Sequence, residues 1–126
     1  MRVLMVEPGK EAVETEIENS LEAMQAAVGG YIEMIQPYAD DVALICNEEG
    51  KLEHLPLNRV ICDEETGQPL DVIAGTFFIC GAPANSSEFA SLSDEQLQKY
   101  QQKFQSPEMI LPDDEGIIVI RGMDSM

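Results

Sequence analysis

The chain has 126 residues, of which 44% are hydrophobic, so it is long enough for one domain with a single hydrophobic core. It carries 24 acidic residues against 7 Lys and Arg, and its formal net charge is -17 at pH 7. This charge argues against direct binding of nucleic acid or of an anionic membrane, and it indicates either a solubility device or an interaction surface for a basic partner.

The first two predicted strands form a hairpin with one acidic face. Residues 2–7 are typical of a strand, residues 8–10 of a turn, and residues 11–18 alternate with a period of two. Val13, Thr15 and Ile17 share one face of the second strand. The other face is expected to carry glutamates about 6.5 Å apart. They are Glu14, Glu16 and Glu18.

A helix is predicted next. Asn19 is expected to cap it, because Glu22 three residues later completes a capping-box pattern. Its apolar stripe consists of Leu21, Met24 and Val28. Gly29 and Gly30 are expected to end it, since glycine adopts the left-handed C-terminal conformation without strain. The second glycine also allows close approach of a ligand to the backbone.

The middle of the chain is predicted to form three strands. Two are residues 31–36 and 42–46, followed by a turn at 47–51 in which Gly50 is able to take a positive φ. Residues 52–59 are predicted to be irregular because Pro56 interrupts them, and residues 63–69 form a polar turn. Residues 71–80 are apolar on both faces and are predicted to be one central strand, with a bulge at Gly75.

A second helix and a last strand complete the predicted fold. Ser93 and Gln96 form a capping box, with Leu97, Tyr100 and Phe104 as the buried stripe. Pro107 ends this helix, residues 113–116 form an acidic turn, and residues 117–120 a final strand. We therefore expect an α+β fold over residues 1–126 as a single domain, with a mixed or antiparallel sheet of about five to seven strands and about two helices.

The sequence offers no constellation typical of catalysis or of metal binding. The three cysteines are 16 and 18 residues apart, without the close pairs of a zinc site, and their odd number is typical of reduced thiols in the cytoplasm. His54 is the sole histidine, and the acidic runs at 63–65 and 113–115 lack the spacing of a calcium loop. We expect no enzyme activity, no metal and no cofactor. No apolar run approaches the roughly 20 residues of a membrane span.

Two groups of residues are candidates for binding. The first is a compact polar segment that could hold an anion, although pairing of its cations with neighbouring glutamates is the favoured interpretation. Its residues are Asn47, Lys51, Asn58 and Arg59. The second is an acidic interaction face built around the predicted carboxylate ladder. Its residues are Glu14, Glu16, Glu18, Glu22 and Glu33.

Four segments together resemble the family called domain of unknown function 3846. They are residues 6–10, 21–33, 45–59 and 73–81, and their order and spacing cover roughly residues 1–105. The C-terminal extension at 106–126 lies outside the pattern. The resemblance implies a small protein of phages or mobile elements of Gram-positive bacteria, with no assigned reaction and no established catalytic residue. His54 stands where the family is expected to have a small residue.

This context favours a counter-defence role in a bacterial host cell by analogy. The first hypothesis is a non-enzymatic binding protein that blocks a host defence protein through its acidic face, in one form as a DNA mimic. The second is a sponge for a small nucleotide signal, which a homo-oligomer would hold at the polar segment. The third is an accessory protein of element replication or transfer. An enzyme is the least supported.

Overall fold

The computed structural model describes residues 1–113 and 116–121. Their elements follow one another as β1 (Arg2–Val6), β2 (Val13–Glu16), α1 (Leu21–Val28), β3 (Ile32–Ile35), β4 (Val42–Asn47), β5 (Leu57–Cys62), β6 (Pro69–Ala74), β7 (Phe77–Gly81), α2 (Asp94–Phe104), β8 (Glu108–Asp113) and β9 (Gly116–Arg121). No helix in this part of the chain is long and apolar enough to cross a membrane.

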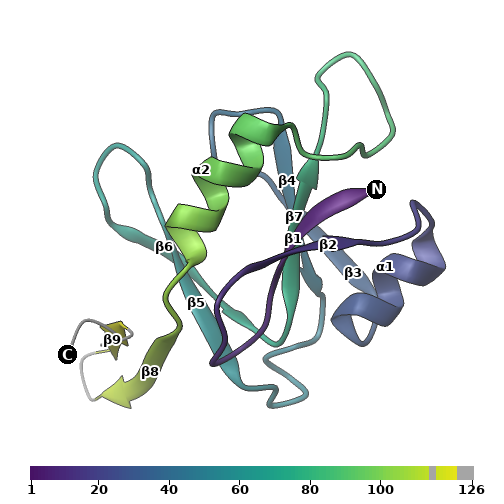
Figure 1. The fold of residues 1–126 in the computed structure, drawn as a ribbon. Coiled ribbons are helices and arrows are strands. Elements are labelled where there is room, and N and C mark those ends of the chain that lie inside the picture. Colours follow the sequence, from purple (N-terminus) through teal and green to yellow (C-terminus); the bar gives the residue numbers. More distant parts are fainter. Residues whose placement is uncertain (114–115, 122–126) are drawn as a thin grey trace.

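Five strands form the main sheet, in the order β2-β1-β7-β4-β3, and every neighbouring pair is antiparallel. The helices lie on either side of the strands (Figure 1). Met24 and Val28 of α1 pack with Phe78 on one face. Tyr100 and Phe104 of α2 pack with Phe77 on the other. Alternate residues of β7 therefore enter opposite cores, and the whole strand is buried.

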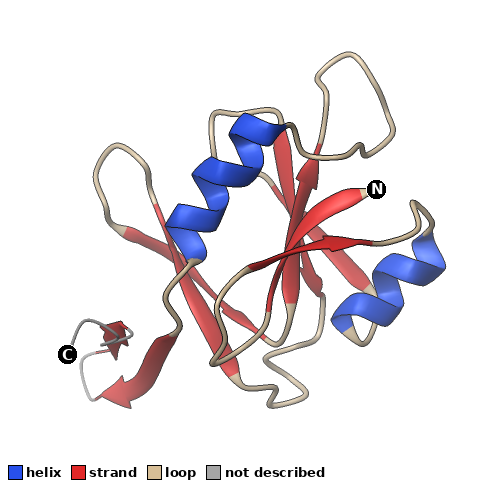
Figure 2. Cartoon of the chain, in the orientation of Figure 1, coloured by secondary structure: helices blue, strands red, loops and turns tan. Residues whose placement is uncertain are grey.

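Two further hairpins stand outside the main sheet. Strands β5 and β6 pair antiparallel, and so do β8 and β9 (Figure 2). Ile61 and Ile73 bring the β5–β6 hairpin into the core beneath α2. The backbone N–H of Val60 donates to the Glu108 side chain at 2.8 Å, which ties β8 to β5. The predicted α+β class with an antiparallel sheet and two helices is confirmed.

The signals at the start of α2 predicted its structure correctly. Ser93 accepts a hydrogen bond from the backbone of Gln96, whose side chain bonds back to the backbone of Ser93. The three residues predicted to be its buried stripe are all buried. At α1 the predicted cap is wrong. Ser20 is the N-cap, while the Asn19 side chain donates to the carbonyl of Phe89. Leu21 is 55% exposed, so the α1 stripe is shorter than predicted.

Two predictions about the middle of the chain are also wrong. The segment expected to be irregular contains β5, because Pro56 precedes this strand and does not interrupt it. The single strand expected at 71–80 is two strands in different sheets, β6 and β7. The chain turns between them at Gly75, which has φ +85° and donates its N–H to the carbonyl of Pro56 at 2.7 Å.

The C-terminal part contains one strand more than predicted. The final strand predicted at 117–120 is present as β9, and its partner β8 was not predicted. Of the acidic turn predicted at 113–116, residues 114 and 115 lie outside the described residues. The apolar run of β8 is only three residues long and is followed by Pro112, whereas that of β9 is four residues long and is flanked in the sequence by Gly116 and Gly122, which is why only β9 stood out.

Gly50 is required by close packing and not by a positive φ. A Cβ atom there would lie 2.6 Å from the backbone oxygen of Ala74, where neither side can shift freely. We expect Gly50→Ala to lower the free energy of unfolding by about 1–3 kcal/mol, as overpacking does. Urea unfolding followed by circular dichroism measures it. A midpoint equal to that of the wild type would show that the 47–55 loop moves away from β6 without cost.

Candidate functional site

Two members of the predicted carboxylate ladder, Glu14 and Glu16, lie on β2 at one edge of the main sheet, and the third, Glu18, follows the end of this strand. Glu14 is the cross-strand partner of Leu4, and Glu16 is the partner of Arg2. Cross-strand partners share a face of a sheet. Since Leu4 packs in the core beneath α2, Glu14 and Glu16 lie on the α2 side of the sheet, where both are exposed. The predicted period of two is therefore present in β2.

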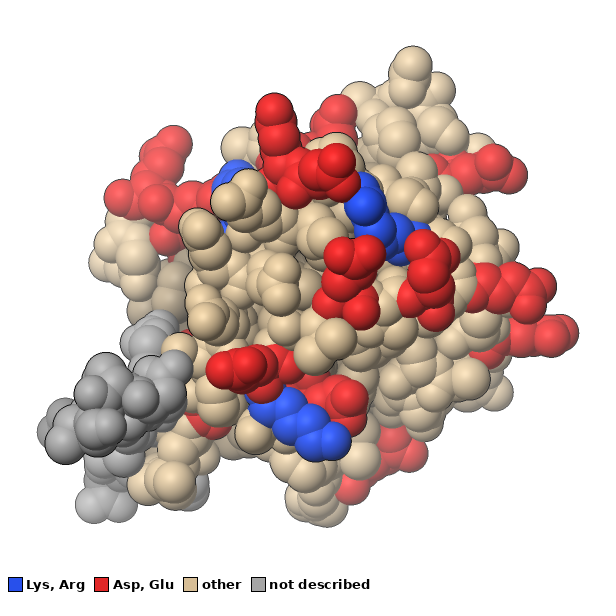
Figure 3. Space-filling view, viewed as in Figure 1, with Lys and Arg blue, Asp and Glu red and all other residues tan. Residues whose placement is uncertain are grey.

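The start of α2 contributes further carboxylates to this side. Asp94 and Glu95 lie in its first turn, where the helix dipole favours negative charge. Arg2 of β1, the cross-strand partner of Glu16, bonds the start of the helix: Asp94 at 2.8 Å and the carbonyl of Leu92 at 2.9 Å. Figure 3 shows this side of the molecule, with many more acidic than basic groups over β2 and α2. We call the set Glu14, Glu16, Glu18, Asp94 and Glu95 the acidic face.

The structure separates the other two predicted members of this surface. Glu22 is exposed in the first turn of α1. Glu33 is exposed on β3, at the opposite edge of the sheet from β2, so it does not extend the ladder. Within the face, Glu16 is 3.3 Å from the N-terminal ammonium group. Among the described residues, Glu14 and Glu18 have no basic group within salt-bridge distance.

The six basic side chains that the structure describes are all engaged within the molecule. Four exposed or half-exposed lysines pair with carboxylates: Lys10 with Glu7, Lys51 with Asp71, and both Lys99 and Lys103 with Glu64. Arg2 pairs with Asp94, as described above. Arg59 is 1% exposed. The excess of carboxylates is thus left on the surface with no described cation free to neutralise it.

Asn58 and Arg59, two of the four predicted anion-binding residues, bind the protein's own backbone. The Arg59 guanidinium donates from Nη2 to the carbonyls of Lys10 and Phe104, at 2.7 and 2.9 Å, and from Nη1 to the Asn58 side chain at 2.8 Å. Asn58 donates to the carbonyls of Val6 and Gly75. Burial lowers the pKa of Arg59, and the nearby carboxylate of Glu108 opposes this shift.

The other two predicted residues lie elsewhere: Asn47 is the last residue of β4, and Lys51 lies on the loop between β4 and β5. The Lys51 ammonium group bonds Asp71 at 2.7 Å in a partly exposed pair. Both Asn47 and Lys51 line a cavity of about 390 Å³ that also contains Glu33, Glu48 and Asp71. Neither Asn58 nor Arg59 lines it. The structure therefore does not bring the four predicted residues together.

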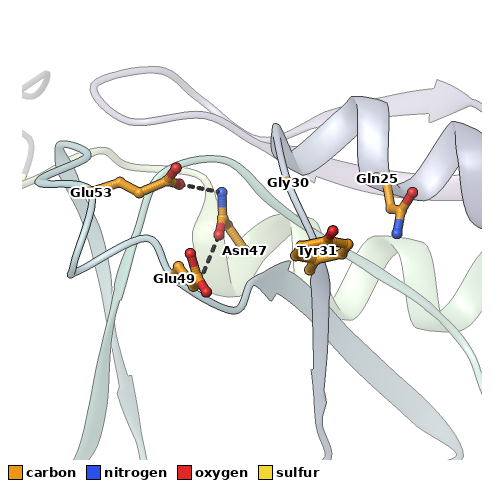
Figure 4. Close-up of a pocket in the computed structure, with 6 residues that line it drawn as sticks. All are labelled: Gln25, Gly30, Tyr31, Asn47, Glu49 and Glu53. Atoms are coloured by element: carbon orange, nitrogen blue, oxygen red, sulfur yellow. Dashed lines mark hydrogen bonds between the residues drawn. The ribbon is translucent and has the colours of Figure 1, made fainter.

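A smaller cavity of about 240 Å³ opens at the C-terminal end of α1 (Figure 4). It is lined by Gln25, Gly30, Tyr31, Asn47, Glu49 and Glu53. Gly29 ends the helix in the left-handed conformation, with φ +80°. Gly30 then passes so close to Asn47 that a Cβ atom would lie 2.8 Å from its Nδ2. Gly29 thus ends the helix, and Gly30 allows the backbone to pass close to the side chain of Asn47.

Asn47 organises the wall of this cavity. It is 5% exposed, and its Nδ2 donates to the carbonyl of Val28 at 3.3 Å and to Glu53 at 3.1 Å. Its Oδ1 accepts from the backbone N–H of Glu49 at 2.8 Å. The sequence indicated Asn47 and Gly30 but not Tyr31 or Glu53. Tyr31 and Glu53 are distant in sequence, and only the pairing of β3 with β4 brings them to one cavity.

The described residues include no group of three or more His, Cys, Asp or Glu placed to hold a metal ion. Two of the cysteines are core residues. Burial raises the pKa of Cys46 to about 12, with a further contribution from Glu33, and burial alone raises that of Cys80 to about 12. His54 is exposed in the β4–β5 loop, where it has φ +57°.

Replacing Arg59 tests whether it is a structural residue. Lysine has one ammonium group and cannot reach Lys10, Phe104 and Asn58 together, so we expect Arg59→Lys to lose about 2–4 kcal/mol of unfolding free energy. Lys51→Ala removes only an exposed ion pair and is expected to cost less than about 1 kcal/mol. Chemical denaturation compares the two. Equal stabilities would mean that the buried contacts of Arg59 contribute little to folding.

Thiol titration tests the burial of the cysteines. Only Cys62 is partly exposed, while Cys46 and Cys80 are buried. We expect one thiol of the native protein to react promptly with Ellman's reagent at pH 8 and all three to react after unfolding, since the thiolate is the reactive form. Cys62→Ser is expected to abolish the prompt reaction. Prompt reaction of a second thiol in the native protein would contradict the described core.

The comparisons with known proteins identify a family. No curated protein and no solved structure matches the chain. A family model described as Domain of unknown function (DUF3846) matches residues 1–105, which contain the main sheet, both helices and the β5–β6 hairpin. The β8–β9 hairpin lies beyond the matched residues. The resemblance noted from the sequence is confirmed, and the chain belongs to the DUF3846 family.

Proposed function

We propose that this protein is a non-enzymatic binding protein whose acidic face docks on a basic surface of a partner protein. The observation that carries the proposal is the distribution of charge on β2 and α2. Glu14 and Glu18 are exposed, while the described basic side chains are paired or buried. Such a face attracts a positive surface over long range and gives specificity through complementary charge.

In the most specific form of this proposal, the partner is a DNA-binding protein of a host defence system. The acidic face then occupies the cleft that would otherwise hold DNA. The sequence resemblance led us to expect an origin in phages or mobile elements, and this form of the proposal rests on that expected context by analogy. An accessory role in element replication or transfer would use the same docking chemistry with a different basic partner.

Sequestration of a nucleotide signal has less support. A nucleotide site needs cations or backbone donors that converge on phosphate. Lys51 pairs with Asp71, and the Asn58 amide and the Nη2 of Arg59 donate to backbone carbonyls in the interior, where Arg59 is buried. The cavity that Asn47 and Lys51 share also contains three carboxylates, those of Glu33, Glu48 and Asp71, which would repel a phosphate.

Two variants of equal net charge test the acidic face. The first neutralises its ladder, with Glu14→Gln, Glu16→Gln and Glu18→Gln together. The second neutralises three exposed carboxylates elsewhere, with Glu33→Gln, Glu48→Gln and Glu65→Gln. A partner is captured on the wild-type protein from a bacterial lysate at low salt and purified, and its Kd is measured by calorimetry for all three proteins. We expect the first variant to bind about tenfold more weakly and the second within about twofold of wild type.

Salt and DNA provide the controls. Binding through exposed charges weakens as NaCl is added, and a DNA mimic is displaced from its partner by duplex DNA. Equal losses of affinity in both variants would mean that the net charge matters and the acidic face does not. Affinity that is the same at low and high salt would rule out docking through exposed carboxylates.

A further inference from the structure

The cavity at the end of α1 has the features of a cation site. Two of its six lining residues are glutamates, and none is Lys or Arg. Glu49 and Glu53 are exposed, and the Tyr31 side chain is 68% exposed beside them. An aromatic ring attracts a cation to its face, and the attraction adds to that of nearby carboxylates. The lining thus combines both kinds of group that favour positive charge.

The position of the cavity at a helix end also favours a positively charged ligand. The C-terminal end of a helix carries partial negative charge, and a cation there is stabilised. Natural helices often place a basic residue in the last turn for this reason. In α1 the last turn has no basic residue, and Gln25 and Gly30, which line the cavity, lie on either side of the helix end. The negative end of α1 therefore has no cation from the helix itself.

The wall of the cavity is fixed before any ligand arrives. Asn47 holds the Glu53 carboxylate and the backbone of Glu49 through hydrogen bonds of 3.1 and 2.8 Å, and it is itself anchored on the carbonyl of Val28. The backbone carbonyl of Tyr31 accepts a hydrogen bond from the backbone N–H of Glu48 at 2.9 Å, which fixes the backbone that carries the Tyr31 ring. Figure 4 shows Asn47, Glu49 and Glu53 on one side of Tyr31 and Gln25 on the other. Preorganisation lowers the cost of binding.

We propose that this cavity receives the guanidinium group of an arginine side chain from the partner protein. Its volume of about 240 Å³ is below the roughly 300–1,000 Å³ of pockets for drug-sized ligands, so it suits one side chain. A guanidinium group is planar, stacks on an aromatic ring and donates to two acceptors at once, which matches Tyr31 with Glu49 and Glu53. The inference rests on the proposed function only for the source of the arginine.

The site is tested on the intact protein with N-acetylarginine amide as the probe and N-acetylcitrulline amide as its uncharged isostere. Titration is followed in ¹H–¹⁵N NMR spectra at low salt. We expect saturable shifts at Gly30 and Tyr31 with a Kd on the order of millimolar, and binding of the citrulline probe at least about fivefold weaker. Tyr31→Ala and Glu53→Gln are each expected to weaken arginine binding at least about fivefold. The amide introduced by Glu53→Gln keeps an oxygen that can accept from Asn47, so the loop remains folded.

Glu65→Gln is the matched control, because it removes the same charge from an exposed residue outside both the cavity and the acidic face, and it is expected to leave arginine binding unchanged. Equal shifts with both probes, unsaturable shifts spread over many acidic residues, or undiminished binding by Tyr31→Ala would overturn the proposal. Failure of the acidic face is a separate result. It would appear as unchanged partner affinity in the β2 variant, whether or not the cavity binds arginine.

Discussion

The fold depends on the buried pair Asn58 and Arg59, because these two side chains connect the β5–β6 hairpin to the rest of the protein. Asn58 donates to the end of β1 and to the turn between β6 and β7. Arg59 donates to the β1–β2 loop and to the last carbonyl of α2. A buried donor or acceptor without a partner costs more than a typical hydrogen bond contributes, so these contacts must form together. They satisfy a helix end, a strand end and a loop at one point.

This constraint also shapes the surface. A buried arginine is one cation fewer to offset the carboxylates outside, and the described lysines and Arg2 are each held by an acidic side chain. In a chain of net charge -17, exposed acids such as Glu14 and Glu18 must remain unneutralised. Interior packing and surface charge are therefore linked, because Asn58 and Arg59, two of the four residues predicted to bind an anion, are used inside the protein.

Local signals predicted much of the fold, and contacts distant in sequence account for the errors. The capping box of α2 and the alternation of β2 depend on neighbouring residues, and both were predicted correctly. The apolar run at 71–80 hides a change of sheet at Gly75, which only the contact with Pro56 reveals. The burial of Arg59 contradicts the expectation that arginine lies at the surface. Tyr31 and Glu53 line one cavity because β3 pairs with β4, which no periodicity encodes.

The glutamates of β2 have an alternative explanation, since charged side chains on an edge strand prevent pairing with another sheet. To protect the edge of a sheet, charged side chains are needed only on the edge strand itself. The acidic face also includes the first turn of α2, which belongs to no edge. Arg2 of β1, the cross-strand partner of Glu16, bonds Asp94 and the carbonyl of Leu92 at the start of this helix. The opposite edge, β3, carries the single acid Glu33 beside an exposed Met34. The two edges of the sheet therefore do not carry acids alike, and the acids of β2 continue onto a helix, which favours docking over protection as the role of the ladder.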